Sequence, residues 1–176
     1  MKKLILYIVI ASSILTSQDQ LFVGTRPLGM GGAFIAVADD GNTITWNPAG
    51  LPRLRRKEFT SSYADLYAMD ITHSYTGIVW PFGDRIAVGF DWANVGFDDQ
   101  ELSYSENKLN FSIGYQPFKL VSIGGTFKYL SRDMGLDGTS YGKSTGIGYD
   151  LGLLISPRKK IRFGLGVYDL GGTNVT

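Results

Sequence analysis

Large apolar residues recur at every second position through long segments of this chain from Lys57 onward. In Val121–Tyr129, for example, four of the five odd positions are apolar or aromatic, and the even positions hold Ser, Gly, Thr and Lys. Alternation with a period of two is typical of a β-strand that has one apolar and one polar face. Other such segments, the first two less regular, lie at 58–68, 72–82, 86–92, 109–116, 146–155 and 161–168. The sequence therefore predicts an all-β, antiparallel chain of about seven strands.

Two architectures produce this alternation: a soluble β-sandwich and a transmembrane β-barrel of outer-membrane type. The segments span about 9 to 12 residues, the length that a tilted strand needs to cross a bilayer. Their second face is polar or glycine, and aromatic residues gather near their ends, as at a lumen and at membrane interfaces. We therefore expect a membrane barrel, with a soluble secreted β-sandwich binding module as an alternative. The candidates for lining its lumen are Asn110, Ser112, Thr126 and Lys128.

The connections between the segments support the barrel. Tight turns are predicted at 81–84, 117–119 and 156–160, where proline stands beside polar or basic residues. Longer polar loops are predicted between them, at 98–107 and 132–143. Short turns on one side and long loops on the other are typical of an up-and-down barrel.

Composition excludes several classes of function. Lys and Arg number 17 against 16 Asp and Glu, a net charge of +1, so no attraction for nucleic acid is expected. The absence of Cys and the single His leave no thiolate or His-rich metal site. That residue, His73, cannot act with the adjacent Ser74, because neighbouring residues of a strand point to opposite faces. We expect no enzymatic activity, no catalytic residue, no cofactor and no metal.

The N-terminus has the pattern of a Sec-type signal peptide, predicted to span residues 1–17. Residues 1–3 include two lysines, residues 4–15 are apolar apart from two serines, and polar residues follow at 18–20. The apolar stretch is short for a membrane span, although an N-terminal anchor is the alternative. We expect the mature protein to reside in the outer membrane of a Gram-negative-type cell.

Residues 18–56 precede the strands and are predicted to form a hatch or plug for the barrel. Gly29, Gly31 and Gly32 permit backbone conformations and close approaches that other residues do not. The apolar run 33–38 must be covered by another part of the molecule.

Turn and cap signals follow that run. Asp39 or Asp40 is expected to N-cap a short helix that ends near Trp46. Asn47 and Pro48 then start a turn, because Pro48 fixes the backbone and the Asn47 side chain can accept a hydrogen bond from the residues after it.

Within 24–51, the run Arg-x-Leu-Gly-Met-Gly-Gly-Ala-x-x-Ala-x-Ala-Asp-Asp is followed by Trp-Asn-Pro-Ala-Gly-Leu. This composite resembles the N-terminal signature of the FadL-like outer-membrane proteins and is most similar to the PorV/PorQ branch. The resemblance implies a hatch-bearing barrel that passes hydrophobic small molecules such as long-chain fatty acids. Alternatively, it implies a type IX secretion accessory that handles secreted protein cargo. The signature residues are Arg26, Gly29, Gly31, Gly32, Asp39, Asp40, Trp46, Asn47, Pro48 and Gly50.

Seven strands do not close a bacterial single-chain barrel, in which even strand numbers are the rule. We therefore expect residues 57–176 to be the first half of a barrel, closed by a missing C-terminal half or by another copy. The expected partners are outer-membrane lipid and either hydrophobic small molecules or secreted protein cargo. A basic cluster precedes the first strand and is expected to be a solvated collar or to contact phosphate headgroups or a periplasmic partner. It consists of Arg53, Arg55, Arg56 and Lys57.

Overall fold

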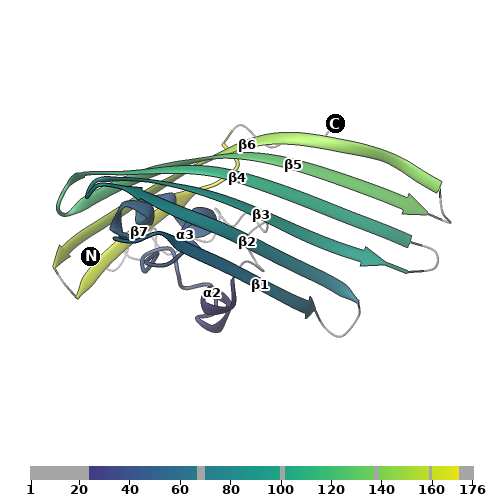
Figure 1. Ribbon diagram of the computed structural model, residues 1–176, viewed down its shortest axis with the longest axis horizontal. Helices are drawn as coiled ribbons and strands as arrows, with labels where there is room; N and C mark the ends of the chain where they lie inside the picture. Colours follow the sequence, from purple (N-terminus) through teal and green to yellow (C-terminus); the bar gives the residue numbers. More distant parts are fainter. Residues whose placement is uncertain (1–23, 67–69, 100–101, 137–138, 159, 171–176) are drawn as a thin grey trace, which may run out of the picture.

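The computed structural model describes residues 24–66, 70–99, 102–136, 139–158 and 160–170. Seven strands in these ranges form one antiparallel sheet in sequence order (Figure 1). Their bounds are β1 Glu58–Leu66, β2 Ile71–Phe82, β3 Ile86–Asp98, β4 Leu102–Phe118, β5 Val121–Leu136, β6 Thr139–Arg158 and β7 Ile161–Val167. The predicted all-β class and the number of strands are thus confirmed. The predicted signal peptide lies outside the described residues.

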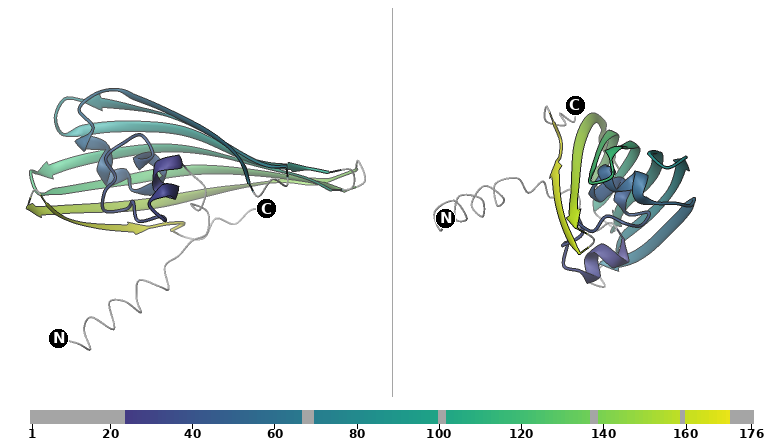
Figure 2. Two further views of the ribbon diagram at one scale, coloured as in Figure 1. Left: turned by 90° about the horizontal axis from the view of Figure 1, so that it is seen from below. Right: turned by 90° about the vertical axis from the view of Figure 1, so that its left-hand side faces the viewer.

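The sheet curls along its strand order into a half-barrel, which the right-hand view of Figure 2 shows end-on. The strands form a single sheet, which differs from the two packed sheets of a β-sandwich. The β2–β3, β4–β5 and β6–β7 connections meet at one end of the sheet, on the left in Figure 1, which we call the turn end. The opposite end is called the distal end. No helix in the described ranges is long and apolar enough to cross a membrane.

The two faces of the sheet carry different side chains. In β4, Asn110 and Ser112 are buried on the concave face, whereas Leu109, Phe111 and Ile113 are exposed on the outward face. Successive side chains of a strand point to opposite faces, so the alternation in the sequence becomes a polar concave face and an apolar outward face.

Strand pairing arranges the outward residues in continuous rows. One apolar row consists of Trp92, Leu109, Tyr129 and Ile147. The next outward row towards the distal end is polar and consists of Asn94, Asn107, Ser131 and Thr145. From Tyr129 back to Val121 at the turn end, β5 covers eight positions, or about 27 Å of strand. We call the outward surface between the Tyr129 row and the turn end the apolar band.

The prediction of long polar loops at 98–107 and 132–143 is wrong, because both stretches are mostly strand. Only three residues separate β3 from β4, and two separate β5 from β6. Backbone pairing does not require apolar side chains, and polar side chains interact across these strands instead. Arg132 Nε, for example, donates to Glu106 Oε2 on the neighbouring strand at 2.6 Å.

Residues 24–54, which we call the N-terminal segment, lie on the concave side of the sheet towards the turn end (Figure 2). The segment contains α2 (Thr25–Gly29), α3 (Thr43–Trp46) and the 3-10 helix η2 (Pro48–Arg53). Its buried apolar side chains pack with inward residues of the strands in two clusters. These are Phe34, Ala38, Trp46, Ala49 and Leu154, and Ile44, Leu51, Leu54, Val79 and Ala87.

Candidate functional site between the N-terminal segment and the concave face

Glycines of the concave face allow the backbone of the N-terminal segment to lie directly on the sheet. A Cβ atom at Gly124 would overlap the carbonyl group of Pro48, and one at Gly164 would lie 2.6 Å from the carbonyl oxygen of Ile35. Such separations are far below van der Waals contact, so no larger residue fits without moving the segment. The other inward glycines whose Cβ would meet the segment are Gly77, Gly89, Gly114 and Gly152.

Asn47 ties the segment together and joins it to the sheet. Its Oδ1 accepts from the backbone N–H of Ala49 at 3.1 Å, which confirms the forward bond expected from the sequence. Its Nδ2 donates to the carbonyl oxygens of Ile35 at 2.8 Å and of Leu153 in β6 at 3.3 Å. Pro48 follows as the first residue of η2, as a turn-starting proline should.

The other signature residues near this turn are also packed closely. Gly50 is buried, and a Cβ there would overlap the carbonyl oxygen of Ala38. Trp46 is 6% exposed and meets the ring of Phe34 edge-on, with 6.2 Å between the ring centroids.

Arg26, Asp39 and Asp40 form an exposed ion-pair cluster at the two ends of one loop. Nη1 of Arg26 lies 2.7 Å from Oδ1 of Asp39 and 2.7 Å from Oδ2 of Asp40. The hydrogen bonds to Asp40 and then Asp39 raise the pKa of the Arg26 guanidinium above its ordinary value. Between these residues, Gly31 and Gly32 adopt positive φ angles of 63° and 78°.

Two expectations for this region need correction. The residue at the N-cap of α3 is Asn42, so neither Asp39 nor Asp40 holds that position. Asp40 instead acts two residues before the N-cap, where its Oδ1 accepts from the backbone N–H of Asn42 at 2.9 Å. Gly29 ends α2, and no atom lies within 4 Å of where its Cβ would be, so no close approach requires glycine there.

Asp91 is fully buried at the centre of the concave face. Its carboxylate accepts from Thr45 Oγ1 in the segment at 2.9 Å and from Asn110 Nδ2 at 2.8 Å. The hydroxyl of Tyr75 also donates to it, at 3.5 Å. Sequence reasoning placed Asn110 but missed Asp91 and Tyr75. The available signal was that Asp91 shares the polar phase of its strand's alternation.

The remaining residues predicted to line a lumen also form hydrogen bonds or ion pairs. Lys128 Nζ lies 2.9 Å from Asp150 Oδ1 and 2.5 Å from Asp169 Oδ1, and all three side chains are largely buried. The hydroxyls of Ser112 and Thr126 lie 2.7 Å apart, so one donates to the other, and the carbonyl oxygen of Ile44 in α3 lies within hydrogen-bond distance of both. The residues predicted to line a lumen therefore lie on the concave face, where they contact the segment or neighbouring strands.

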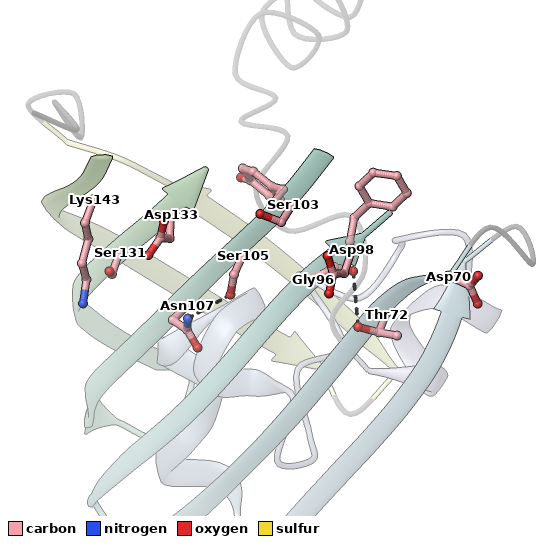
Figure 3. A pocket seen from close by; sticks show the side chains of 12 residues that line it. Asp70, Thr72, Gly96, Asp98, Ser103, Ser105, Asn107, Ser131, Asp133 and Lys143 are labelled. Atoms are coloured by element: carbon pink, nitrogen blue, oxygen red, sulfur yellow. Dashed lines mark hydrogen bonds between the residues drawn. The ribbon is translucent and has the colours of Figure 1, made fainter. Parts of the chain in front are cut away.

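A polar pocket of about 540 Å³ opens on the outward face at the distal end, beyond the apolar band (Figure 3). Thr72 Oγ1 donates to the carbonyl oxygen of Gly96 at 3.3 Å, and Asn107 Nδ2 donates to Ser105 Oγ at 3.4 Å. The other labelled residues in Figure 3 are Asp70, Asp98, Ser103, Ser131, Asp133 and Lys143. Within the described residues, no group of three His, Cys, Asp or Glu side chains is placed to hold a metal ion.

His73 and Ser74 point to opposite faces, as expected for neighbours in a strand. His73 is 3% exposed on the concave face, where it lies near the charge of Lys108, whereas Ser74 is on the outward phase of β2.

A search with the sequence finds no matching family model and no matching curated protein.

Proposed function

We propose that the strands form part of an outer-membrane β-barrel wall and that the N-terminal segment is its internal hatch. The apolar band carries this proposal. Its side chains are large and well exposed, with Phe111, Ile113 and Phe163 at 53%, 51% and 61% of their full surface. Soluble proteins rarely expose a continuous apolar patch above a few hundred Å², whereas lipid is a suitable solvent for such a surface.

The dimensions and borders of the band agree with a bilayer. A strand length of about 27 Å, tilted by about 40°, corresponds to an apolar thickness of about 21 Å. At the border towards the distal end, the indole N–H of Trp92 donates to Asn107 Oδ1 in the first polar row at 3.2 Å. This arrangement suits an interfacial tryptophan, whose ring prefers the apolar side and whose N–H prefers the polar side.

As its function, we propose the passage of hydrophobic small molecules such as long-chain fatty acids across the outer membrane. This part rests on the resemblance of residues 24–51 to the FadL-like signature. The concave face is lined by charged and hydroxyl side chains, including Asp91 and Lys128, which suit a hydrophobic molecule poorly. We therefore propose entry near the hatch and exit through the wall. Closure requires further strands from a C-terminal half or another copy.

A type IX secretion accessory is the second candidate, and the distal end favours it. There β4, β5 and β6 continue past the apolar band as paired strands with polar side chains on the outward face. Such an extension would stand clear of the membrane and offers a polar surface to secreted protein cargo.

Membrane fractionation followed by gene deletion tests the proposal. The protein should remain in the outer-membrane fraction after carbonate extraction, and its recovery as a soluble periplasmic protein would refute the membrane location. Reduced uptake of labelled fatty acid in the deletion strain supports transport. Normal uptake with secreted proteins retained in the periplasm would instead support the secretion role.

A further inference from the structure

A second pocket lies at the turn end, on the rim of the sheet beside the apolar band. Its volume is about 550 Å³, and it is formed by the β2–β3 and β4–β5 turns together with residue 55, just after the N-terminal segment. Its lining differs from that of the distal pocket because basic side chains predominate. The residues include Arg55, Asp84, Arg85, Gln116, Phe118 and Lys119.

The pocket has more positive than negative charge. Arg55 Nη1 lies 3.2 Å from Asp84 Oδ1 and also donates to the carbonyl oxygen of Asp84 at 3.1 Å. This pair accounts for the only carboxylate in the lining. Arg85 and Lys119 are exposed and have no ion-pair partner within the described residues. Two basic groups are therefore available to an anion.

The surroundings of the pocket indicate that this anion carries an apolar tail. Phe118 is 70% exposed and Phe82 is 58% exposed, and both stand at the turn-end border of the apolar band. Nearby, the ammonium of Lys57 lies 3.3 Å from the ring centroid of Trp80, which is itself part of the band. A basic group above an interfacial aromatic is the pattern expected at the level of lipid headgroups.

We propose that this pocket binds the phosphate headgroup of an anionic phospholipid in the leaflet at the turn end. Arg85 and Lys119 would hold the phosphate, and the acyl chains would lie along the band next to Phe118. The inference rests on the proposed membrane location and adds a lipid site to it. The distal pocket, with Asp70, Asp98 and Asp133 against Lys143, should repel the same headgroup.

Tryptophan quenching by brominated lipids tests the site in the full chain. Trp80 lies in the band near the turn end and Trp92 at its distal border, while Trp46 is 6% exposed inside the half-barrel. Trp92→Phe leaves Trp80 as the outward reporter, and Trp80→Phe leaves Trp92. Each protein is reconstituted into phosphatidylcholine vesicles that contain brominated phosphatidylglycerol or brominated phosphatidylcholine.

At Trp80 we expect brominated phosphatidylglycerol to bind roughly five-fold or more tightly than brominated phosphatidylcholine, which is the effect of about one basic group at an anionic surface. The double variant Arg85→Gln/Lys119→Gln should lose this preference. The matched control Arg158→Gln/Lys160→Gln removes two charges at the same end but outside the pocket lining, and should keep it. Trp92 should show no preference.

Each alternative outcome has a defined meaning. Quenching of both tryptophans by either lipid without preference would overturn the lipid site and leave the membrane location standing. An equal loss in Arg158→Gln/Lys160→Gln would also overturn it, because general surface charge would then explain the preference. If millimolar inorganic phosphate abolished the preference, the site would bind free phosphate rather than lipid. No quenching of either tryptophan would refute the membrane location itself, and the lipid site with it.

Discussion

The concave and outward faces of the sheet belong to the same strands, but the concave face buries charged side chains and the outward face exposes apolar ones. On the concave face, Asp91, Lys128 and Asp150 are each less than 7% exposed. On the outward face, Phe111 and Tyr149 each expose 53% of their surface. A soluble protein distributes these residues the other way, because burial of large apolar side chains drives its folding.

This difference implies that different forces hold the two faces. The N-terminal segment is held on the concave face by hydrogen bonds, ion pairs and close backbone contact, together with two small apolar clusters. The outward face makes few contacts within the chain and depends on the medium outside it. Substitutions at neighbouring positions of one strand should therefore have unlike effects, according to the face that each side chain meets.

Adjacent glycines of β5 give the largest expected contrast. Gly124→Val places a branched side chain where the backbone of Pro48 and Ala49 lies, so the N-terminal segment must move away from the concave face. We expect a loss of about 4 to 5 kcal/mol in the free energy of unfolding. Urea unfolding measures this loss, and limited proteolysis should show cleavage within residues 24–54.

Gly125→Val is the matched control, because Gly125 faces outward and its nearest neighbours would be 3.7 Å from a Cβ atom. That variant should keep the segment protected and lose less than about 1 kcal/mol. Equal protease sensitivity of the two variants would mean that the segment does not rest on the concave face as described.

Removal of the buried Lys128 ammonium tests how much the ion pairs of the concave face contribute to stability. Lys128→Ala leaves Asp150 and Asp169 without their shared cation in a largely buried place. We expect a loss of about 3 kcal/mol in the free energy of unfolding, because uncompensated buried charges are costly. The triple variant that also replaces both aspartates by Asn should recover part of the loss. No recovery would show that the lysine acts through packing alone.

The two faces also explain which parts of the fold the sequence predicts. Apart from Gly125, Val121–Tyr129 alternates because its odd positions place apolar side chains on the outward face and its even positions place small or polar side chains against the concave face. Beyond Tyr129 the apolar residues Leu130, Met134 and Leu136 fall on the other phase of β5 and are interrupted by Arg132, so the alternation breaks and the sequence predicts a loop where the strand continues to Leu136. Pairing with neighbouring strands, rather than side-chain type, maintains the strand there.

In the candidate site, contacts between residues close in the sequence can be predicted, whereas contacts between distant residues cannot. Asn47 bonds forward to Ala49 through a local turn, which residue type alone predicts. Its Nδ2 also donates to Leu153, 106 positions along the chain, and the hydrogen bond between Thr45 and Asp91 spans 46 positions. Such pairs depend on how the segment sits on the curled sheet, and the alternation pattern contains no information about that.

A lysine on the outward face tests the medium that this face requires. Phe111 lies in the middle of the apolar band, so Phe111→Lys should reduce the stability of the protein folded in lipid vesicles by about 2 to 3 kcal/mol. Phe118→Lys at the turn-end border should cost less than about 1 kcal/mol. Urea unfolding in vesicles measures both. If neither substitution changed the stability of the protein in vesicles, the result would argue against contact of the band with lipid.

The smallest expected effect is at the exposed ion pairs of Arg26. Nη1 of this arginine contacts both Asp39 and Asp40, but its side chain is 46% exposed, so solvent screens the interaction. We expect Arg26→Ala to reduce the free energy of unfolding by less than about 1 kcal/mol, and added salt to reduce the difference further. Urea unfolding at two salt concentrations measures this, with Lys128→Ala as the reference for a buried cation. A loss as large as that of Lys128→Ala, and insensitive to salt, would show that Arg26 anchors the segment as strongly as the buried network does.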